Sequence, residues 1–490
     1  MTDREACDAL VIGGGVNGLV AAAYLARAGK RTLLLEPGQS AGGLCRAVDM
    51  GNGFLAPMAA HTLYALDPRV TTELKLTRHG LKFAVRDAPT VLLRDGDEHL
   101  VATRDIRTTA RNISVISKAD AEAWPQYQRE LFACGRHMRA LWWEEEKAFT
   151  PDDTIERLTR TGTGAWLDSW FESDALKAML AFDASALSSI ETGSSLLLAW
   201  RAAQEMCGLQ AATAFPAGGP AMLVQALLEA CKIAGVDIGT GACVEELTVK
   251  DGRVTGAYLR SGEAVSASLV LSSLSRRKTL LELANGEALG LAECRTLQNA
   301  PAPLAAAKVL LAFDQLPFTG GAAEKMSGRA IVADRLESYA FAHAAARAGR
   351  IPEEPVMEIV FPADPSFATS GNHVASIMVR PVPYDVAGGW GAHKTAFAAA
   401  VVARLNQRIP GLAKRVTGAK VFTPKDLSAN GNAPPDAVSA SRMLASWSRR
   451  MQTSIDGLFL CGEDAEPVPA VSGRAGRIAA ALAMKAAAAS

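Results

Sequence analysis

The chain has 490 residues, with 51 basic and 51 acidic side chains and a formal net charge of zero. This length exceeds what one simple hydrophobic core supports, so we expect at least two domains. A balanced charge argues against a polyanionic partner and excludes nucleic acid as the expected ligand.

The eight cysteines are scattered without a C-x-x-C pair, and the seven histidines are equally dispersed. This pattern favours free thiols in a reducing compartment and predicts no metal site. An apolar strand begins within ten residues of Met1 and leaves no room for a signal peptide, and no apolar run is long enough to cross a bilayer. We therefore expect a cytoplasmic protein. Nothing in the sequence indicates a membrane contact, and it leaves the oligomeric state open.

The most informative segment is the apolar run 9–12, which leads into Gly13-Gly14-Gly15-Val16-Asn17-Gly18 and a helix of small residues. In a G-x-G-x-x-G turn between strand and helix, the glycines allow a tight turn and a close approach of backbone to a pyrophosphate. The helix N-terminus offers free N–H groups to the same anion. The segment predicts a dinucleotide site.

The residues that follow complete this pattern. Residues 19–28 have helical spacing, Gly29 is suited to a helix C-cap, and 31–35 form a second apolar strand that ends at Glu36. Glu36 lies where a carboxylate is expected to meet a ribose hydroxyl. Because no second strand–glycine–helix unit with a downstream acid is present, we expect no separate NAD(P) domain.

The remaining chain divides into blocks with different residue patterns. Residues 90–116 alternate as strands do, and 119–212 carry helical patterns, notably 119–141 and 191–205. From Phe215 a helix is predicted at 220–234, followed by strands at 236–238, 243–249, 253–259 and 264–271. A mixed block covers 303–440, with strands at 306–313, 356–361 and 374–379 and a helix at 394–409.

The last segment repeats the order of the first: the strand 457–461, a turn at Gly462, an acidic loop, and a small-residue helix from Gly473 towards residue 488. Trp142 and Trp143 precede three glutamates, which disfavour contact with an anionic membrane, so we expect these tryptophans to pack within the helical block.

Together, the glycine turn at 13–18, the Phe215-Pro216-Ala217-Gly218-Gly219 entry to a helix and the 457–476 unit resemble the phytoene-desaturase-like flavoproteins. Segments 73–81 and 422–427 are similar to the branch of pyridine nucleotide-disulphide oxidoreductase domain-containing proteins. The resemblance implies an α/β fold: a discontinuous Rossmann-like FAD-binding domain of the glutathione-reductase, amine oxidase and phytoene desaturase type, with an inserted α+β substrate domain. The expected bounds are 1–80, 214–290 and 440–490 for the FAD domain, and 81–213 and 291–439 for the substrate or cap domain.

The resemblance also assigns cofactor roles. It places Gly13, Gly15 and Gly18 at the pyrophosphate, Glu36 at the ribose, Gly42 and Gly43 behind the diphosphate and ribityl chain, Val244 at the adenine, and Gly462 and Glu463 near the flavin. Arg46 is a candidate for holding phosphate charge. The full set of expected FAD-binding residues is Gly13, Gly15, Val16, Asn17, Gly18, Glu36, Pro37, Gly42, Gly43, Arg46, Val244, Gly462, Glu463, Asp464, Ser472 and Gly473.

One departure from the family concerns the loop after the terminal strand. The family carries Thr-His-Pro and a glycine run there, whereas this chain has Ala465-Glu466-Pro467-Val468-Pro469-Ala470. Glu466 is the candidate for attracting a cationic substrate or acting as a base, and His61 for acid–base work. Arg474 or Arg477, in the first turn of the last helix, would stabilise negative charge on a reduced flavin.

These observations leave three functions open. The first is an FAD-dependent dehydrogenase, desaturase or oxidase that moves a hydride from an apolar small molecule to flavin N5, with oxygen, a quinone or another small acceptor taking the electrons. The second is an amine oxidase-like enzyme, favoured by the acidic loop. The third is a flavoprotein with mainly an interaction or regulatory role.

Overall fold

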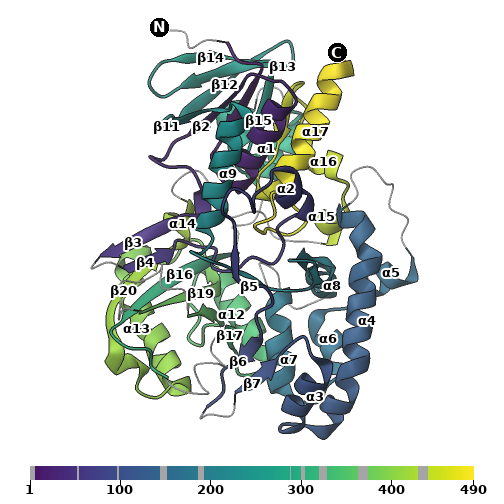
Figure 1. Ribbon diagram of the computed structural model, residues 1–490, viewed down its shortest axis with the longest axis vertical. Helices are drawn as coiled ribbons and strands as arrows, with labels where there is room; N and C mark the ends of the chain where they lie inside the picture. Colours follow the sequence, from purple (N-terminus) through teal and green to yellow (C-terminus); the bar gives the residue numbers. More distant parts are fainter. Residues whose placement is uncertain are drawn as a thin grey trace.

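The computed structural model describes residues 6–51, 54–95, 99–143, 152–185, 193–286, 289–299, 304–318, 328–361, 373–428 and 440–489. At one end of the molecule, which holds both termini, lies a parallel five-stranded sheet (Figure 1). Its order is β11-β2-β1-β15-β21, with bounds Asp237–Thr240, Thr32–Glu36, Ala9–Ile12, Leu269–Ser272 and Leu458–Leu460. Strands far apart in the chain, from each of the three segments expected to bind FAD, therefore share one sheet.

This sheet is covered on both faces, which explains its continuous apolar strands. Ala9 and Val11 of β1 share a core with three helices, α1 (Val16–Arg27), α9 (Ala221–Ala234) and α17 (Arg474–Ala489). Leu10 and Ile12 share a second core with an antiparallel three-stranded sheet, made of β12 (Val244–Lys250), β13 (Arg253–Leu259) and β14 (Ala264–Ser266). The strand period of two thus builds a three-layer arrangement.

A seven-stranded sheet lies at the other end of the molecule, in the order β20-β16-β19-β18-β17-β6-β7. The bounds are Val416–Phe422, Leu304–Phe313, His373–Pro383, Met357–Val360, Arg329–Val332, Thr90–Leu92 and Leu100–Ala102. Val309 and Leu311 of β16 pack with Phe397 and Val401 of α13 (Trp390–Arg408), and α12 (Glu337–Arg347) lies nearby. The opposite sheet face is directed towards the five-stranded domain. Short strands β3 (Ala47–Gly51) and β4 (Phe54–Pro57) pair beside it, and β5 (Phe83–Val85) pairs with β10 (Phe215–Pro216).

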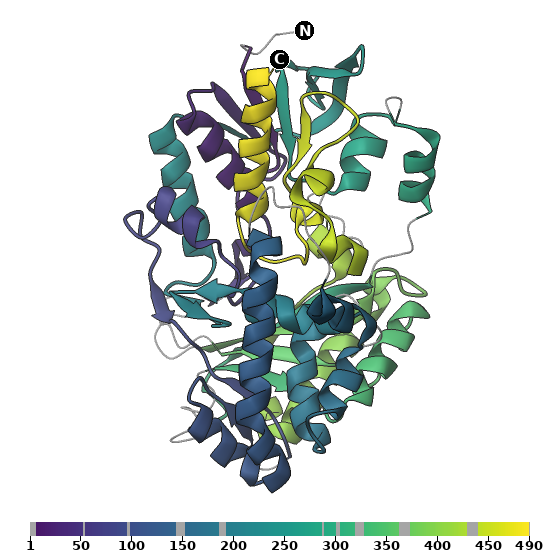
Figure 2. The same ribbon diagram turned by 90° about the vertical axis from the view of Figure 1, so that its right-hand side faces the viewer.

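A helical block stands beside this sheet, with the long α4 (Lys118–Trp143) running along it (Figure 2). Its other helices are α3 (Ile106–Ser114), α5 (Asp153–Arg160), α6 (Thr163–Asp168), α7 (Asp174–Ala181) and α8 (Ser195–Ala203). Trp142 is fully buried, and its Nε1 donates to the carbonyl of Met443 at 2.9 Å. The tryptophan therefore packs inside the molecule, as the sequence predicted.

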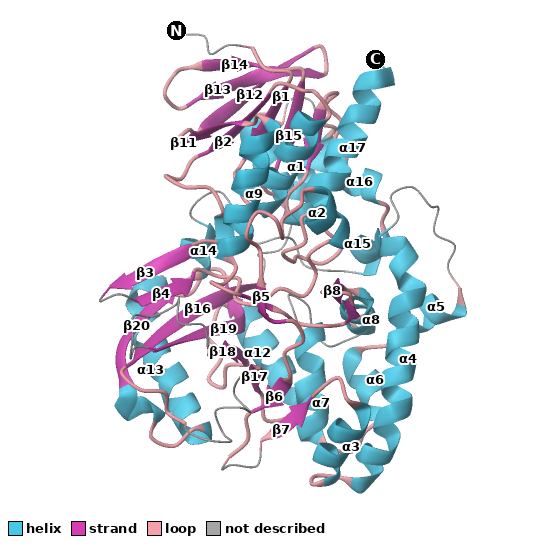
Figure 3. Cartoon of the chain, in the orientation of Figure 1, coloured by secondary structure: helices cyan, strands magenta, loops and turns pink. Residues whose placement is uncertain are grey.

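Shorter elements complete the described chain: α2 (Pro68–Glu73), α10 (Leu291–Gln298), α14 (Pro424–Ser428), α15 (Ala440–Leu444), α16 (Trp447–Met451), and the pair β8 (Glu205–Met206) and β9 (Leu209–Gln210) (Figure 3). Among the described helices, none combines the length and apolar character needed to span a bilayer. All eight cysteines are free thiols. The described residues contain no cluster of three or more His, Cys, Asp or Glu suited to a metal ion.

Two local predictions were wrong. The strand-like alternation over 90–116 ends at Ala102, because the Asp105 side chain accepts from the Thr108 N–H and starts helix α3. The single strand predicted at 264–271 divides into β14 and β15, which belong to different sheets. For the helix predicted at 191–205, residues 191 and 192 lie outside the described part, and α8 covers 195–203.

Candidate functional site: a cofactor cradle and an adjoining chamber

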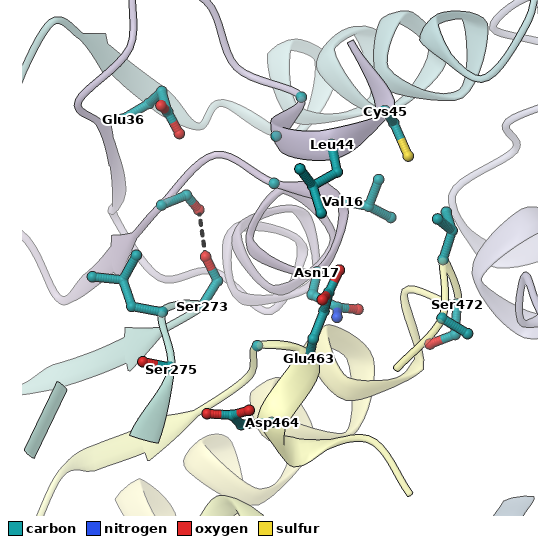
Figure 4. Close-up of a pocket in the computed structure, with 18 residues that line it drawn as sticks. Val16, Asn17, Glu36, Leu44, Cys45, Ser273, Ser275, Glu463, Asp464 and Ser472 are labelled. Carbon is teal, nitrogen blue, oxygen red and sulfur yellow. Dashed lines mark hydrogen bonds between the residues drawn. The ribbon is translucent and has the colours of Figure 1, made fainter. Parts of the chain in front are cut away.

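The turn between β1 and α1 forms one wall of a cradle (Figure 4). Gly13, Gly15, Val16 and Asn17 all line it, and Gly15 is the N-cap of α1. Gly18 packs the helix onto the strand instead, because a Cβ at this position would lie 2.0 Å from the carbonyl oxygen of Gly13. Gly13 and Gly15 therefore lie where the resemblance places them, whereas the expected place of Gly18 at the pyrophosphate has no support in this geometry.

The space around Gly15 indicates whether the cradle has room for a cofactor. A Cβ added to Gly15 would meet no protein atom within 4 Å, so the protein's own packing does not require a glycine there. The side-chain oxygen of Asn17, the second residue of α1, is buried without a hydrogen-bond partner among the described residues. Open space beside a helix N-terminus fits a bound diphosphate group, and the unpaired acceptor of Asn17 fits a hydroxyl donor of a cofactor.

Glu36 lies at the end of β2 and lines the same cradle. One carboxylate oxygen accepts from the Gly14 N–H and the other from the Gly38 N–H, each at 2.8 Å. The two bonds fix the carboxylate, and each oxygen keeps a lone pair for a ribose hydroxyl.

Gly42 and Gly43 also line the cradle, next to Leu44 and Cys45. Arg46 does not line it: its Nε donates to the carbonyl of Gly43 at 3.1 Å, and Nη2 lies 3.5 Å from the Met58 sulfur. No lysine or arginine is among the described residues that line the cradle. A diphosphate there would depend on backbone N–H groups and the α1 dipole, so the expected role of Arg46 has no support in this geometry.

The C-terminal segment supplies the opposite wall through Gly462, Glu463, Asp464 and Ser472. Glu463 projects to the middle of the cradle beside Asn17 (Figure 4). Burial, assisted by Asp464 and Glu466, raises the pKa of Glu463 to about 7. Gly473 does not line the cradle: it has φ +68, and an added Cβ would lie 3.1 Å from Val20, so its role is to turn the chain into α17.

Pro37 and Val244 line a separate pocket on the other side of Ile12 and Leu35. Leu274 borders both this pocket and the cradle. The pocket therefore adjoins the cradle at Leu274, and this position is compatible with the adenine role expected of Val244.

A chamber of about 190 Å³ adjoins the cradle at its other end, and we call it the flavin-side chamber. Leu44, Glu463, Ala470 and Val471 line both spaces. The chamber extends from there to the seven-stranded sheet. Its walls include the apolar side chains of Trp200, Met378, Val468 and Pro469, and the polar side chains of His61, Asp183, Arg201, Arg329, Glu358 and Arg380.

His61 lies on this chamber in a buried chain of polar contacts. Its Nε2 is 2.9 Å from Glu358 Oε1, and its Nδ1 is 3.0 Å from Lys308 Nζ and 3.1 Å from Ser376 Oγ. Lys308 Nζ also donates to the carbonyl of Ala59 at 2.8 Å. The Ser376 carbonyl oxygen is also 3.1 Å from Nδ1. Because a carboxylate only accepts, we assign the imidazole proton to Nε2, and Nδ1 then accepts from Lys308 Nζ and Ser376 Oγ.

Burial and neighbouring charges determine the protonation states in this chain of contacts. It lowers the pKa of His61 to about 4, with Lys308 adding to the effect, and lowers the pKa of Lys308 to about 7. Burial alone would raise the pKa of Glu358, but its bond to His61 and the charge of Arg329 outweigh it and hold this pKa below its usual value. At neutral pH the histidine is therefore neutral, the glutamate ionised, and the lysine close to its titration midpoint.

A second ionic group borders the chamber beside Glu358. Arg329 binds Asp183 through two parallel bonds of 2.7 and 2.8 Å and reaches Glu358 at 3.4 Å. Arg201 of α8 is 3.8 Å from the same aspartate. The Arg201 guanidinium also lies over the Tyr64 ring at 4.9 Å.

Glu466 does not line the cradle or the chamber. It is fully buried, and its Oε1 accepts from the Ser472 hydroxyl and, at 3.1 Å, from the Ala475 N–H in the first turn of α17. The interpretation of Glu466 as a residue that meets a cationic substrate therefore has no support in the structure. Arg474 and Arg477 are also turned away from the cradle: both approach Asp67, at 3.5 and 3.3 Å.

Five charged residues at or beside the chamber were not predicted from the sequence: Lys308, Glu358, Arg329, Asp183 and Arg201. For three of them the sequence contains a recognisable signal, a charged residue within an apolar segment. Lys308 is the only charged residue of Leu-Ala-Ala-Ala-Lys-Val-Leu-Leu-Ala-Phe, and Glu358 and Arg201 stand in similarly apolar segments. A charged side chain within a buried strand or helix needs a partner, so such residues are worth marking before a structure is known.

Comparison with known proteins agrees with this geometry. The family model described as flavin-containing amine oxidoreductase matches residues 17–466. The pyridine nucleotide-disulfide oxidoreductase domain-containing protein 2 of Rattus norvegicus is 30% identical, over 96% of this chain and 92% of its own length. An oxidoreductase from Methanosarcina mazei has TM-score 0.67 and 19% identity, covering 98% of this chain and 100% of that one. A putrescine oxidase has TM-score 0.69 and 15% identity, covering 99% of each chain.

A three-layer nucleotide domain, a glycine cradle and an adjoining chamber define an FAD-dependent oxidoreductase. The chain belongs to the family of flavin-containing amine oxidoreductases, and its cofactor is FAD. The predicted family resemblance and fold class are confirmed.

Proposed function

We propose that the protein oxidises a small, largely apolar molecule in the flavin-side chamber by removing a hydride from one of its carbon atoms. The observation that carries this proposal is the junction of cradle and chamber at Leu44, Glu463, Ala470 and Val471, which would bring a cofactor held in the cradle to the chamber wall. FAD supplies the hydride acceptor at ring atom N5 and passes the electrons to oxygen, a quinone or another small acceptor.

The protein's own residues would act by binding and orienting. Trp200, Met378, Val468 and Pro469 give the chamber apolar walls that hold an apolar substrate and exclude water. Lys308 can take up or release a proton near neutral pH, since its pKa is about 7, and its contact with His61 Nδ1 links it to the chamber wall. Both ring nitrogens of His61 contact protein atoms, so we propose that His61 is a positioning residue that holds Lys308 and Glu358 beside the chamber.

The test is anaerobic reduction of the FAD-loaded protein by a panel of small apolar alcohols, alkenes, carboxylates and amines, followed by visible absorbance. We expect at least one class to bleach the flavin, and His61→Gln to slow bleaching at least tenfold while FAD content stays unchanged. Dithionite is the control that shows the bound flavin to be reducible. A flavin that dithionite reduces and no member of the panel reduces would contradict the proposal and favour the regulatory role.

Amine oxidation is the second candidate, because the family model is that of amine oxidoreductases and a structural neighbour is a putrescine oxidase. Three carboxylates line the chamber, and Asp183, Glu358 and Glu463 are the groups that an ammonium would meet. Asp183 and Glu358 already contact arginine or histidine, which lowers their capacity to bind a further cation. Burial raises the pKa of Glu463 to about 7, which lowers its negative charge at neutral pH. Bleaching by amines alone would make amine oxidation the function.

A further inference from the structure

A second chamber, of about 160 Å³, lies within the helical block, and we call it the distal chamber. Three residues line both it and the flavin-side chamber: Asp183, Arg201 and Arg329. The two chambers therefore border the same ionic group, and a ligand that reached from one chamber to the other would pass these three side chains.

The charges on the distal chamber do not balance. Arg104 binds Asp87 at 2.5 and 3.2 Å, and Arg329 binds Asp183 at 2.7 and 2.8 Å. Each aspartate is thus taken by one arginine through two bonds. Arg201 is left with a single contact of 3.8 Å to an aspartate that Arg329 already holds.

Arg201 also has more N–H donors than it has acceptors among the described residues. Nη2 donates to Thr213 Oγ1 at 2.6 Å and to the carbonyl of Ala212 at 3.4 Å, whereas Nη1 has no acceptor among the described residues. The side chain is only 9% exposed. Burial, to which the charge of Arg329 adds, outweighs Asp183 and lowers the pKa of Arg201, in agreement with this geometry. A buried guanidinium with free N–H groups is costly unless an anion meets it.

Other unpaired polar groups surround the same space. Trp124, Tyr127 and Gln128 have helical spacing on α4, and all three line the distal chamber. Trp124 Nε1, the Tyr127 hydroxyl and Gln128 Oε1 are buried without hydrogen-bond partners among the described residues. Apolar side chains, including Leu131, Phe132 and Met179, fill the rest of the wall. Two of these orphaned groups are donors, which suits an oxyanion among apolar surroundings.

We infer that the distal chamber binds the anionic end of the substrate, a carboxylate, with Arg201 as its charge partner and Trp124 and Tyr127 as further donors. This inference rests on the proposed function in taking the bound molecule to be the substrate. The substrate is then an apolar organic acid, anchored at Arg201 and extending its reactive carbon into the flavin-side chamber.

The experiment uses the FAD-loaded protein and three ligands that differ only in their end group: phenylbutyrate, phenylbutanol and phenylbutylamine. Binding is measured by calorimetry. We expect phenylbutyrate to bind at least tenfold more tightly than the other two, because only its carboxylate can form a hydrogen-bonded charge pair with Arg201 in an enclosed site. Equal affinities, or tightest binding of the amine, would overturn the inference.

Variants then locate the site. Arg201→Met should reduce the affinity for phenylbutyrate to that for phenylbutanol, whereas Arg107→Met, which removes an exposed arginine of α3, should change neither. Tyr127→Phe should weaken phenylbutyrate binding about threefold to tenfold without lowering Tm, because its hydroxyl has no partner in the protein. If Arg201→Met fails to fold, Tyr127→Phe decides. Unchanged phenylbutyrate affinity in a folded Arg201→Met or in Tyr127→Phe would contradict the inference.

Anaerobic flavin reduction in the same samples separates this inference from the proposed function. Carboxylate binding that depends on Arg201, with no ligand of any class reducing the flavin, would support the anion site and contradict the oxidative function. Reduction only by uncharged or cationic molecules, unaffected by Arg201→Met, would support the function and overturn the inference.

Discussion

The ammonium nitrogen of Lys308 lies 3.0 Å from Nδ1 of His61, so two groups that each can carry a positive charge touch inside the protein. Their contact is possible because burial lowers the pKa of both, to about 7 and about 4. Between pH 4 and pH 7 these pKa values leave the histidine neutral while the lysine is charged. This pair joins the wall of the flavin-side chamber to the face of the seven-stranded sheet.

Lys308→Met should stabilise the protein at neutral pH. Between pH 7 and 10.5 the unfolded lysine binds more protons than the folded one, so the free energy of unfolding rises with pH across this window in the wild type. The variant lacks this slope. We expect it to exceed the wild type by about 1–4 kcal/mol at pH 7, and the difference to shrink towards pH 10.5. Urea unfolding of the apoprotein at several pH values measures it. A variant less stable at pH 7 would show that the bonds of Lys308 to Ala59 and His61 outweigh its burial.

Gly15→Ala and Gly18→Ala form a matched pair that separates cofactor binding from folding. A methyl group on Gly15 meets open space, so the apoprotein should lose at most about 1 kcal/mol of stability. FAD retention should fall at least tenfold, because the methyl occupies space in the cradle. A methyl on Gly18 collides with the Gly13 carbonyl and should destabilise the apoprotein itself. Flavin absorbance after gel filtration and thermal unfolding of the apoproteins give both readouts; full FAD retention by Gly15→Ala would remove that glycine from the site.

Glu463→Gln should change how stability depends on pH. The folded pKa of Glu463 is about 7 and its ordinary value 4.5, so the folded state binds more protons in this window and wild-type stability falls as pH rises through it. Relative to the wild type, the variant should have no stability advantage at pH 4.5 and its full stability advantage above pH 7. Tm of the apoproteins across this range measures the effect, with the exposed Glu245→Gln as control. Parallel Tm curves for wild type and Glu463→Gln would contradict the raised pKa.

Glu466→Gln should leave the choice between amine and carboxylate ligands unchanged. The side chain bonds Ser472 and the first turn of α17 and does not line either chamber, so its loss should lower stability by about 0.5–2 kcal/mol through the helix cap. Calorimetry with phenylbutylamine and phenylbutyrate tests preference, and urea unfolding tests stability. A selective loss of amine affinity would restore Glu466 to substrate binding.

Much of the nucleotide-binding half was predictable because its information is local. The order of strand, glycine turn, helix, strand and acid over residues 9–36 specifies steric and hydrogen-bonding requirements within a short segment. The structure meets them in the Gly18 contact with Gly13 and in the bonds of Glu36 to Gly14 and Gly38. By contrast, the alternation at 106–114 was misinterpreted because the Asp105 cap determined the local structure.

The chamber was not predictable in this way. Lys308, Met378 and Glu358 form a row because strands β16, β19 and β18 pair in one register. His61 meets this row from a segment more than two hundred residues away. No spacing in the sequence encodes such a contact.

The sequence by itself determined the FAD cradle, since close backbone approach requires glycine at fixed positions along one strand and one helix. The tertiary structure alone decided which charges meet around the two chambers. Buried charges are tolerated only beside partners, and those partners come from separate strands and helices whose packing sets the distances. The tertiary structure paired Asp183 with Arg329, left Arg201 with only a 3.8 Å contact to that aspartate, and placed the Glu466 side chain at the first turn of a helix.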